Sequence, residues 1–339
     1  MARKSTTPRP AKAHTPLRAE NRNSNPSPEP SRSTSVADEV SGVSGPTPEA
    51  AASFPVVGIG ASAGGLEAFT ALLTALPADT GMVFVLIQHM DPHHQSVLTS
   101  LLQRATVLPV QEVTDGMSVE PNHIYVIPPN SLMSVSRGVL ALSPRNQHSI
   151  KNLPIDHFFQ ALAEDLGSRA IGVVLSGTAS DGTQGLRAIK ERGGVTFAQD
   201  KESAQYPGMP LSAIAAGCVD FILPPGRIAI ELARINGHPY FRSVHDDEFS
   251  LPEGAVRDGI GAVCRLLKTA TGVDFHLYKP TTIGRRVARR MALRKLSALQ
   301  EYLQLLTEDR TELNLCTRTS SFMSPASSAI RKAFRRCSD

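Results

Sequence analysis

Residues 56–69 read VVGIGASAGGLEAF, an apolar run followed by a turn of small residues and the start of an amphipathic segment. Two motifs share these letters. The pattern GxGxxA that begins at Gly58 matches a dinucleotide-binding turn, whereas the pattern GxSxG that begins at Gly60 matches a nucleophile elbow. Both interpretations predict a strand, a tight turn and a helix. They differ in whether the turn holds a phosphate or presents Ser62 as a nucleophile.

From Phe54 onward, short apolar runs alternate with amphipathic segments, which is typical of βαβ units. The sequence therefore predicts an α/β fold with a doubly wound, mainly parallel sheet. Strands are expected at 56–59, 83–88, 124–127, 172–175, 195–198 and 219–222, helices at 66–76, 96–105, 155–166, 183–192 and 227–235, and a hairpin across 132–135 and 139–142 that turns at Arg137-Gly138.

Composition divides the chain into further parts. Residues 1–53 hold no aromatic residue and are rich in Pro, Ser and Thr, which predicts a disordered N-terminal tail. Beyond the α/β part, helical periodicity at 254–271 and 283–306 predicts a small all-α second domain. The expected organisation is a tail at 1–53, an α/β domain at 54–237, a linker at 238–250, an all-α domain at 251–314 and an aberrant or disordered tail at 315–339.

Several classes of protein are disfavoured by composition and charge. The longest apolar runs, such as 82–87, are far shorter than a membrane-spanning helix, and the basic amino end lacks the apolar region of a secretory signal. The cysteines form no C-x-x-C pair, which favours a reducing cytoplasm. The net charge of +4 is too small and too local for a dedicated nucleic-acid binder. Neither membrane insertion nor a nucleic-acid partner is expected.

Three loops that follow predicted strands carry residues of a hydrolytic triad. Ligands and reacting groups gather at the carboxyl ends of the strands in an open parallel sheet. Ser62, His89 and Asp181 each stand directly after or close behind such a strand. In a triad, His89 accepts the hydroxyl proton of Ser62 while Asp181 orients the imidazole and stabilises its charged form.

Each residue also has a structural interpretation. Ser62 can be a helix N-cap, His89 a strand-end histidine satisfied by backbone groups, and Asp181 the N-cap of the helix that begins at Thr183. Their joint occurrence favours the triad. A dinucleotide site needs an acidic residue at the end of the second strand, where this chain has Gln88-His89-Met90. The order of the residues also differs from the Ser, acid, His order of ordinary α/β-hydrolases.

A cluster of His89, Asp91, His93 and His94 offers metal-ligand types. Pro92 interrupts any regular helical presentation, and no further carboxylate or cysteine has ligand spacing. Solvated residues at a helix start are therefore the favoured interpretation, and no metal or organic cofactor is expected.

Motifs spread over roughly 54–235 resemble the catalytic domain of bacterial chemotaxis protein-glutamate methylesterases. They are GASAGG at 60–65, QHM at 88–90, IYVIPP at 124–129, LSGTASDG at 175–182, and QD at 199–200 followed by YPGMP at 206–210. The resemblance implies hydrolysis of glutamate γ-methyl esters on chemoreceptor helices with release of methanol, and deamidation of receptor glutamines as a second activity. It implies methylated receptors and two-component signalling proteins as partners.

The same resemblance implies a nucleophile at Ser62, a base at His89 and an orienting carboxylate at Asp181. It implies an oxyanion hole from the backbone N–H groups of Ala63 and Thr178, although the family usually has Met-Gly where this chain has Thr178-Ala179. Typical members carry an N-terminal receiver domain, whereas here the tail occupies that place. Control by phosphorylation is therefore not expected, which leaves constitutive activity or control by another partner.

The second domain resembles the helical domain that begins chemotaxis receptor methyltransferases, through TGVDF at 271–275, Tyr278-Lys279 and IGRRVARRM at 283–291. No strand with a Gly-rich loop follows Leu315, so methyltransferase activity is not expected, and a frameshift or truncation would explain the last residues.

The basic residues at 285–295 have two interpretations, a solvated helix face or an electrostatic contact with acidic receptor helices. A non-catalytic adaptor that keeps the receptor-binding surfaces of both parts is the alternative to the enzyme.

Overall fold

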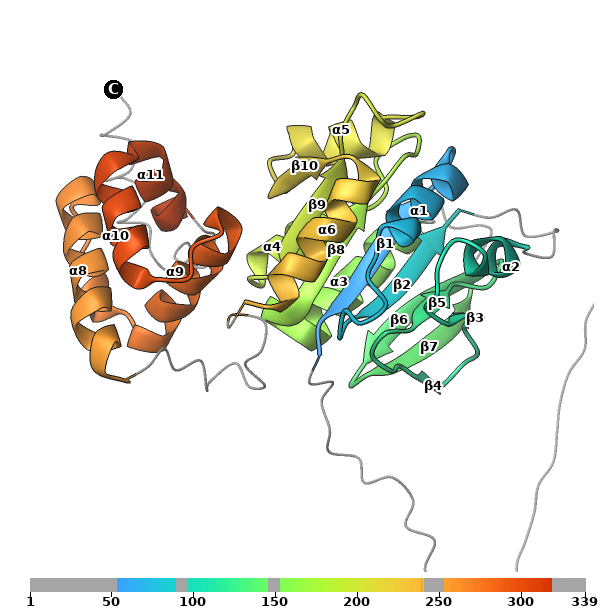
Figure 1. The fold of residues 1–339 in the computed structure, drawn as a ribbon, viewed down its shortest axis with the longest axis horizontal. Helices are drawn as coiled ribbons and strands as arrows, with labels where there is room; N and C mark the ends of the chain where they lie inside the picture. The colour runs from blue at the N-terminus through green and yellow to red at the C-terminus, as the bar shows by residue number, and fades with distance from the viewer. Residues whose placement is uncertain (1–53, 90–96, 146–152, 239, 241–252, 319–339) are drawn as a thin grey trace, which may run out of the picture. The chain divides into compact units, whose positions relative to one another are not determined.

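The computed structural model describes residues 54–89, 97–145, 153–238, 240 and 253–318. The predicted tail at 1–53 and most of the predicted linker lie outside the described residues, as do Asp91, His93 and His94 of the alternative metal cluster. The described chain contains both strands and helices as far as Asn236 and is helical from Glu253 (Figure 1).

A seven-stranded parallel sheet forms the centre of the α/β part, in the order β10-β9-β8-β1-β2-β5-β3. Its strands are β1 Val56–Ala61, β2 Val83–Gln88, β3 Val110–Glu112, β5 Ile124–Val126, β8 Ala170–Val174, β9 Val195–Gln199 and β10 Phe221–Leu223. The chain builds one side of β1 first and then returns to build the other, so the strand order reverses between β1 and β8. The predicted doubly wound, mainly parallel sheet is confirmed.

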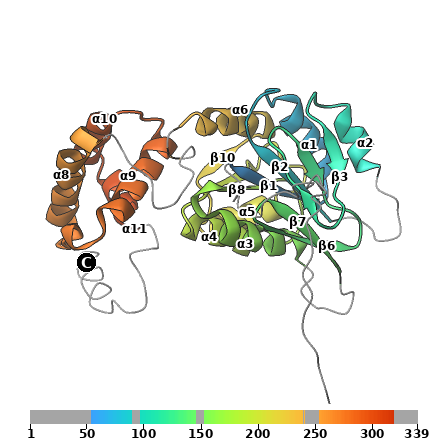
Figure 2. The same ribbon diagram turned by 90° about the horizontal axis from the view of Figure 1, so that it is seen from below.

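Helices cover both faces of this sheet (Figure 2). The first layer contains α1 Gly65–Thr74, α2 Leu98–Gln103 and α6 Pro225–Asn236, and the second contains α3 Pro154–Leu166, α4 Thr183–Glu191 and α5 Gly208–Ala215. Alternate residues of a strand point to opposite faces, so Phe84 and Leu86 of β2 join the first core while Val83 and Val85 join the second.

The glycines of the opening motif are explained by helix packing. A Cβ atom at Gly58 would lie 2.8 Å from the Phe159 ring of α3, and one at Gly60 would overlap the side chain of Ile155. These glycines therefore let α3 approach β1 closely. The packing accounts for the glycines without a bound phosphate.

A smaller antiparallel sheet has the order β4-β7-β6, with β4 Met117–Ser118, β6 Ser131–Ser136 and β7 Val139–Pro144. Arg137 and Gly138 have φ values of 51° and 74°, the left-handed conformation that both central residues of a type I′ hairpin turn require. The predicted hairpin is confirmed. The short strands β3 and β4 and helix α5 were not predicted, because two or three residues carry no periodic signal and α5 contains Gly and Pro.

The helical part consists of α8 Glu253–Thr271, α9 Pro280–Arg294, α10 Leu299–Glu308 and α11 Arg310–Arg318, and the side chains of these helices share one core. Lys295 has a φ of 63°, and this left-handed residue ends α9 inside the predicted 283–306 helical segment. Helix α11 crosses the boundary expected after Asn314, and Cys316 is only 2% exposed. That boundary needs correction, because burial of Leu313 and Cys316 extends the packed helix to Arg318.

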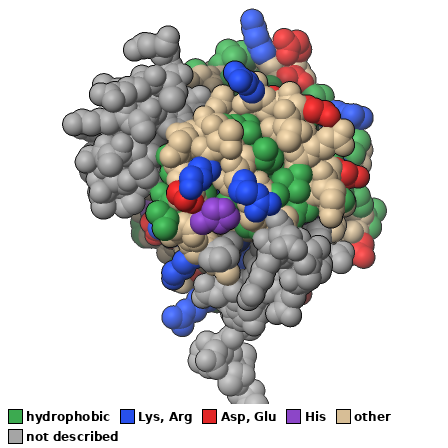
Figure 3. Space-filling view, turned by 90° about the vertical axis from the view of Figure 1, so that its left-hand side faces the viewer, with side chains coloured by type: hydrophobic (Ala, Val, Ile, Leu, Met, Phe, Trp, Pro, Cys, Tyr) green, Lys and Arg blue, Asp and Glu red, His purple; other side chains and the backbone are tan. Residues whose placement is uncertain are grey.

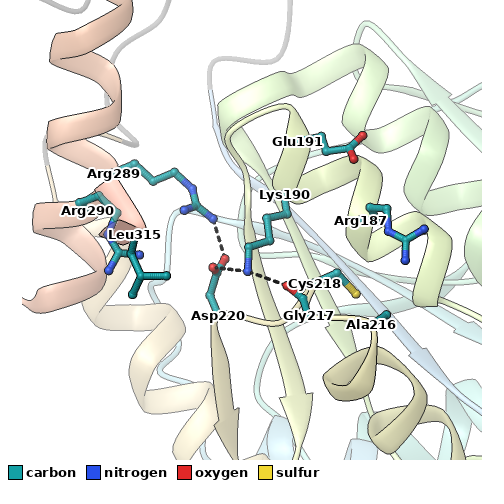
Figure 4. A pocket seen from close by; sticks show the side chains of 10 residues that line it. All are labelled: Arg187, Lys190, Glu191, Ala216, Gly217, Cys218, Asp220, Arg289, Arg290 and Leu315. Carbon is teal, nitrogen blue, oxygen red and sulfur yellow. Dashed lines mark hydrogen bonds and ion pairs between the residues drawn. The ribbon is translucent and has the colours of Figure 1, made fainter. Parts of the chain in front are cut away.

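Most of the basic residues at 285–295 form internal ion pairs. Arg289 is 3% exposed and binds Asp220, which also pairs with Lys190 (Figure 4). Arg290 and Arg294 both bind Glu312. On the face drawn in Figure 3, blue Lys and Arg side chains are scattered rather than gathered in a stripe. Most of these charges are therefore used within the protein, while the side chains of Arg294 and Lys295 remain 38% and 59% exposed.

Candidate active site

Ser62 stands in the turn that connects β1 to α1. Its backbone N–H donates to the Ser176 carbonyl at 2.9 Å, which joins this turn to the loop after β8. Gly64, with a φ of 70°, is the N-cap of α1, and no side chain caps that helix. The alternative interpretation of Ser62 as a helix cap is therefore wrong. Its hydroxyl oxygen lies instead 3.4 Å from Nδ1 of His89.

His89 follows β2, the neighbour of β1 in the sheet. Its Nε2 lies 2.7 Å from Oδ2 of Asp181, and its side chain is 28% exposed. The ring therefore bridges Ser62 and Asp181. The interpretation of His89 as a histidine satisfied by backbone groups is wrong, since both ring nitrogens lie near side-chain partners. With the proton on Nε2, Nδ1 is free to accept the hydroxyl proton of Ser62.

Asp181 is buried in the loop between β8 and α4, with its side chain 1% exposed. Its carboxylate accepts backbone N–H groups from Ile155 at 3.1 Å, Asp156 at 2.9 Å and Gly182 at 2.8 Å. The first two donors, Ile155 and Asp156, belong to the first turn of α3. Asp181 therefore caps α3, whereas the structural interpretation from the sequence had it cap α4. The backbone donors stabilise the negative charge, and Oδ2 is left directed at His89.

Ser176 holds the loops around the site together, and the sequence analysis did not single it out. Its hydroxyl donates to the Ala63 carbonyl at 2.8 Å and accepts the Tyr206 N–H at 3.0 Å, while its own N–H donates to the Gln199 side chain at 2.8 Å. Ser176 is 1% exposed. The available signal in the sequence was the position of Ser176 inside the 175–182 motif, directly after a predicted strand.

The two predicted oxyanion donors lie on adjacent loops, with Ala63 directly after Ser62 and Thr178 exposed in the loop after β8. Within the described residues, the N–H groups of Ala63 and Thr178 donate no hydrogen bond. Ala179, where the resembling family usually has Gly, has a φ of 64°.

Across the described residues, no group of three or more His, Cys, Asp or Glu side chains is arranged to hold a metal ion. In the same part of the chain, no helix combines the length and apolar character needed to cross a membrane. The thiols of Cys218, Cys264 and Cys316 are buried and form no disulfide.

Comparison with known proteins identifies the family. Residues 57–232 match the family described as CheB methylesterase. The chain belongs to the CheB methylesterase family. The crystal structure of the Thermotoga maritima CheB methylesterase catalytic domain is 32% identical, with a TM-score of 0.50 over 53% of this chain and 97% of that chain. The CheB fold and the resemblance stated from the motifs are therefore confirmed.

Residues 258–319 match the all-alpha domain of CheR methyltransferases. The CheB methylesterase domain is therefore followed in the same chain by a CheR-type helical domain. The matched range extends beyond Asn314, in agreement with the course of α11.

Curated relatives include a Rhodobacter capsulatus protein named "Uncharacterized 104.1 kDa protein in hypE 3′ region". It is 38% identical over 68% of this chain and 27% of its own length. A Burkholderia lata protein-glutamate methylesterase/protein-glutamine glutaminase 2 is 38% identical over 56% of each chain. The chain thus spans only 27% and 56% of the length of these two relatives.

Proposed function

We propose that this chain hydrolyses glutamate γ-methyl esters on chemoreceptors, with Ser62 as the nucleophile. The observation that best supports this function is the connected set of Ser62, His89 and Asp181 at the carboxyl ends of β1, β2 and β8. These are three adjacent strands that flank the point where the strand order reverses, the usual place for an active site in such a sheet. The 3.4 Å separation of Ser62 and His89 is typical of a site without substrate.

In the first half-reaction, the Ser62 oxygen attacks the ester carbonyl as Nδ1 of His89 takes its proton. Asp181 stabilises the resulting imidazolium through Nε2–H. The N–H groups of Ala63 and Thr178 receive the negative oxygen of the tetrahedral intermediate, next to the positive N-terminal end of α1. Collapse of the intermediate breaks the bond to the methoxy group, and His89 returns the proton so that methanol leaves.

In the second half-reaction, His89 activates a water molecule that attacks the acyl-enzyme. The products are a glutamate carboxylate and the free Ser62 hydroxyl. Hydrolysis of a glutamine amide follows the same steps with ammonia as the leaving group. We therefore include receptor glutamine deamidation in the proposed function, supported by the methylesterase/glutaminase names of relatives.

The accessibility of the site suits a side chain on a protein. Thr178, Ala179 and Ser180 are exposed beside the triad, and Tyr206 is 42% exposed. Methylated receptor helices are the proposed substrates, and two-component signalling proteins are the proposed regulatory partners. We place the reaction in the cytoplasm, in keeping with buried thiols that form no disulfide.

Methanol release from methylated receptor fragments tests this function. The wild-type chain is expected to release methanol, and Ser62→Ala is expected to release none while it still binds the fragment. Ser136→Ala serves as the matched control, because Ser136 is exposed at the end of β6. A folded wild-type protein that binds receptor fragments without turnover would contradict the enzyme and favour the adaptor.

A further inference from the structure

A second buried carboxylate lies behind the triad. Asp156 belongs to the first turn of α3 and is 5% exposed. Its Oδ1 accepts the backbone N–H of Gly185 at 2.7 Å, and Gly185 belongs to the first turn of α4. Asp156 therefore accepts a hydrogen bond from the first turn of α4, just as Asp181 accepts hydrogen bonds from the first turn of α3.

The two helices thus exchange their caps. Neither has a side-chain cap of its own, since the N-cap residues are Leu153 for α3 and Gly182 for α4. The first N–H groups of a helix have no partner within that helix, and they favour negative charge. Each aspartate supplies that charge to the opposite helix, so the position of Asp181 depends on the position of Asp156.

Close packing makes the exchange sensitive to distance. A Cβ atom at Gly185 would overlap the Phe159 side chain, and one at Gly182 would lie 3.0 Å from Ile155. Helices α3 and α4 therefore contact each other at the same turns that exchange hydrogen bonds. A small displacement of one helix would move the N–H groups that hold Asp181 in front of His89.

We propose that Asp156 is a positioning residue of the esterase site, which fixes α4 against α3 and thereby aims Asp181 at His89. The inference rests on the proposed function, because it assigns Asp156 a role in the same reaction. Asp156 touches neither substrate nor the reacting atoms, and it acts through Asp181.

Electrostatics supports the assignment. Burial raises the pKa of Asp156, the Gly185 N–H opposes this effect, and the negative charge of Asp181 raises the pKa further. The charged group that faces Asp156 is Asp181 on the loop after β8, and beyond it His89 after β2. The effect of the Asp181 charge on the pKa of Asp156 shows that the two carboxylates interact.

Two substitutions separate hydrogen bonding from charge. Asp156→Ala removes the acceptor, and kcat for methanol release is expected to fall roughly 10- to 100-fold with KM unchanged, because small misplacements of catalytic groups have effects of that size. Asp156→Asn keeps an oxygen acceptor and is expected to retain most of kcat.

Glu164→Gln is the matched control, since Glu164 is exposed on the same helix and loses the same charge. Its kcat and pH profile are expected to equal those of the wild type. A folded Asp156→Ala with wild-type kcat would overturn the proposal. If Asp156→Ala does not fold, Asp156→Asn decides, and loss of most of kcat in that folded variant would overturn the proposal, because the oxygen acceptor for the Gly185 N–H is still present.

A readout independent of turnover separates this proposal from the proposed function. The downfield proton resonance of His89 Nε2–H reports the bond to Asp181 even in an inactive protein. Its loss or displacement in Asp156→Ala, with retention in Asp156→Asn and Glu164→Gln, would support the positioning role whether or not the wild type releases methanol. An unchanged resonance in Asp156→Ala would overturn the role while leaving the esterase function intact.

Discussion

The α/β part and the helical part each bury a carboxylate, but they neutralise it differently. Glu312 in α11 has no exposed side-chain surface, and it is bound by Arg290 at 2.7 Å and by the Tyr302 hydroxyl at 3.0 Å. Asp181, at 1% exposure, is held by backbone N–H groups, with His89 as its side-chain partner. Both are fully satisfied, as buried charges must be.

The two kinds of partner give the two buried carboxylates different roles. A guanidinium partner pins Glu312 as a permanent ion pair, which holds α9, α10 and α11 together. Backbone donors fix Asp181 without a second full charge, so its field remains directed at the imidazole. The helical part therefore uses its buried acid for stability, and the α/β part uses its buried acid to orient a catalytic base.

The largest expected effect tests the catalytic side of this comparison. Ser62→Ala is expected to lower kcat by about 10,000-fold or more, because the members of a triad act as a unit. The free energy of unfolding is expected to change by less than about 0.5 kcal/mol, since Ser62 caps no helix. Steady-state methanol release and urea unfolding measure the two quantities. A large stability loss would assign Ser62 a structural role.

For Glu312 we expect the opposite result, a loss of stability without a loss of activity. Glu312→Ala is expected to destabilise the helical part by about 3 kcal/mol, because it leaves Arg290, whose side chain is only 11% exposed, without its partner. Esterase activity is expected to stay near the wild-type value. Urea unfolding followed by the methyl resonances of Met291 and Met133 reports the two parts separately. Glu308→Ala, on the exposed face of α10, is the control. A loss of esterase activity in Glu312→Ala in parallel with its loss of stability would contradict the separate roles of the two carboxylates.

Lowering the pH is expected to affect the stability of the two parts differently. Burial raises the pKa of Glu312, but hydrogen bonding and charge from Arg290 outweigh it and hold the pKa below its ordinary value. The stability from this pair is therefore present above the unfolded pKa of about 4.3 and is lost as pH falls through the folded pKa. Asp156 has a raised pKa, so its contribution to stability increases as pH falls through that value.

On acid titration the Met291 resonances are accordingly expected to report unfolding at a higher pH than the Met133 resonances. Glu312→Gln is expected to flatten the Met291 response. Loss of both signals at one pH, unchanged in Glu312→Gln, would contradict the assignment of acid sensitivity to this pair.

A smaller effect is expected from packing behind the elbow. Gly60→Ala is expected to destabilise the α/β part by about 1–3 kcal/mol, since the new methyl group would overlap Ile155. Activity should fall as well, because the Ile155 N–H holds Asp181. Gly284→Ala in α9 is the control, as a Cβ there meets nothing within 4 Å. A smaller cost of Gly60→Ala in an Ile155→Ala background, which lacks the overlapping γ carbons, would confirm the steric cause, and a stable, active Gly60→Ala would refute it.

The smallest expected effect is a gain in stability. Ala179→Gly is expected to stabilise the protein by about 0.5–1 kcal/mol, because a φ of 64° is strained for alanine, while the greater unfolded-state entropy of glycine offsets part of the gain. Ala71→Gly on the exposed face of α1 is expected to cost about 1 kcal/mol. Thermal unfolding of both variants checks the pair, and a destabilised Ala179→Gly would contradict the strain.

The sequence alone determined the βαβ pattern, the strand ends that carry Ser62, His89 and Asp181, and the order of motifs that marks the CheB methylesterase family. Apolar runs and turn residues are local signals, and the rule for parallel sheets converts them into a site. The Arg137-Gly138 hairpin belongs to the same class, since both positions need a left-handed backbone.

Only the tertiary structure decided the contacts between distant segments. The exchange of caps between α3 and α4, the bonds of Ser176 and the ion pairs of the basic segment all join residues far apart in the chain. No local pattern shows which N–H group an aspartate will meet. For the same reason the course of α11 past Asn314 was missed, because burial of Cys316 depends on the helices packed against it.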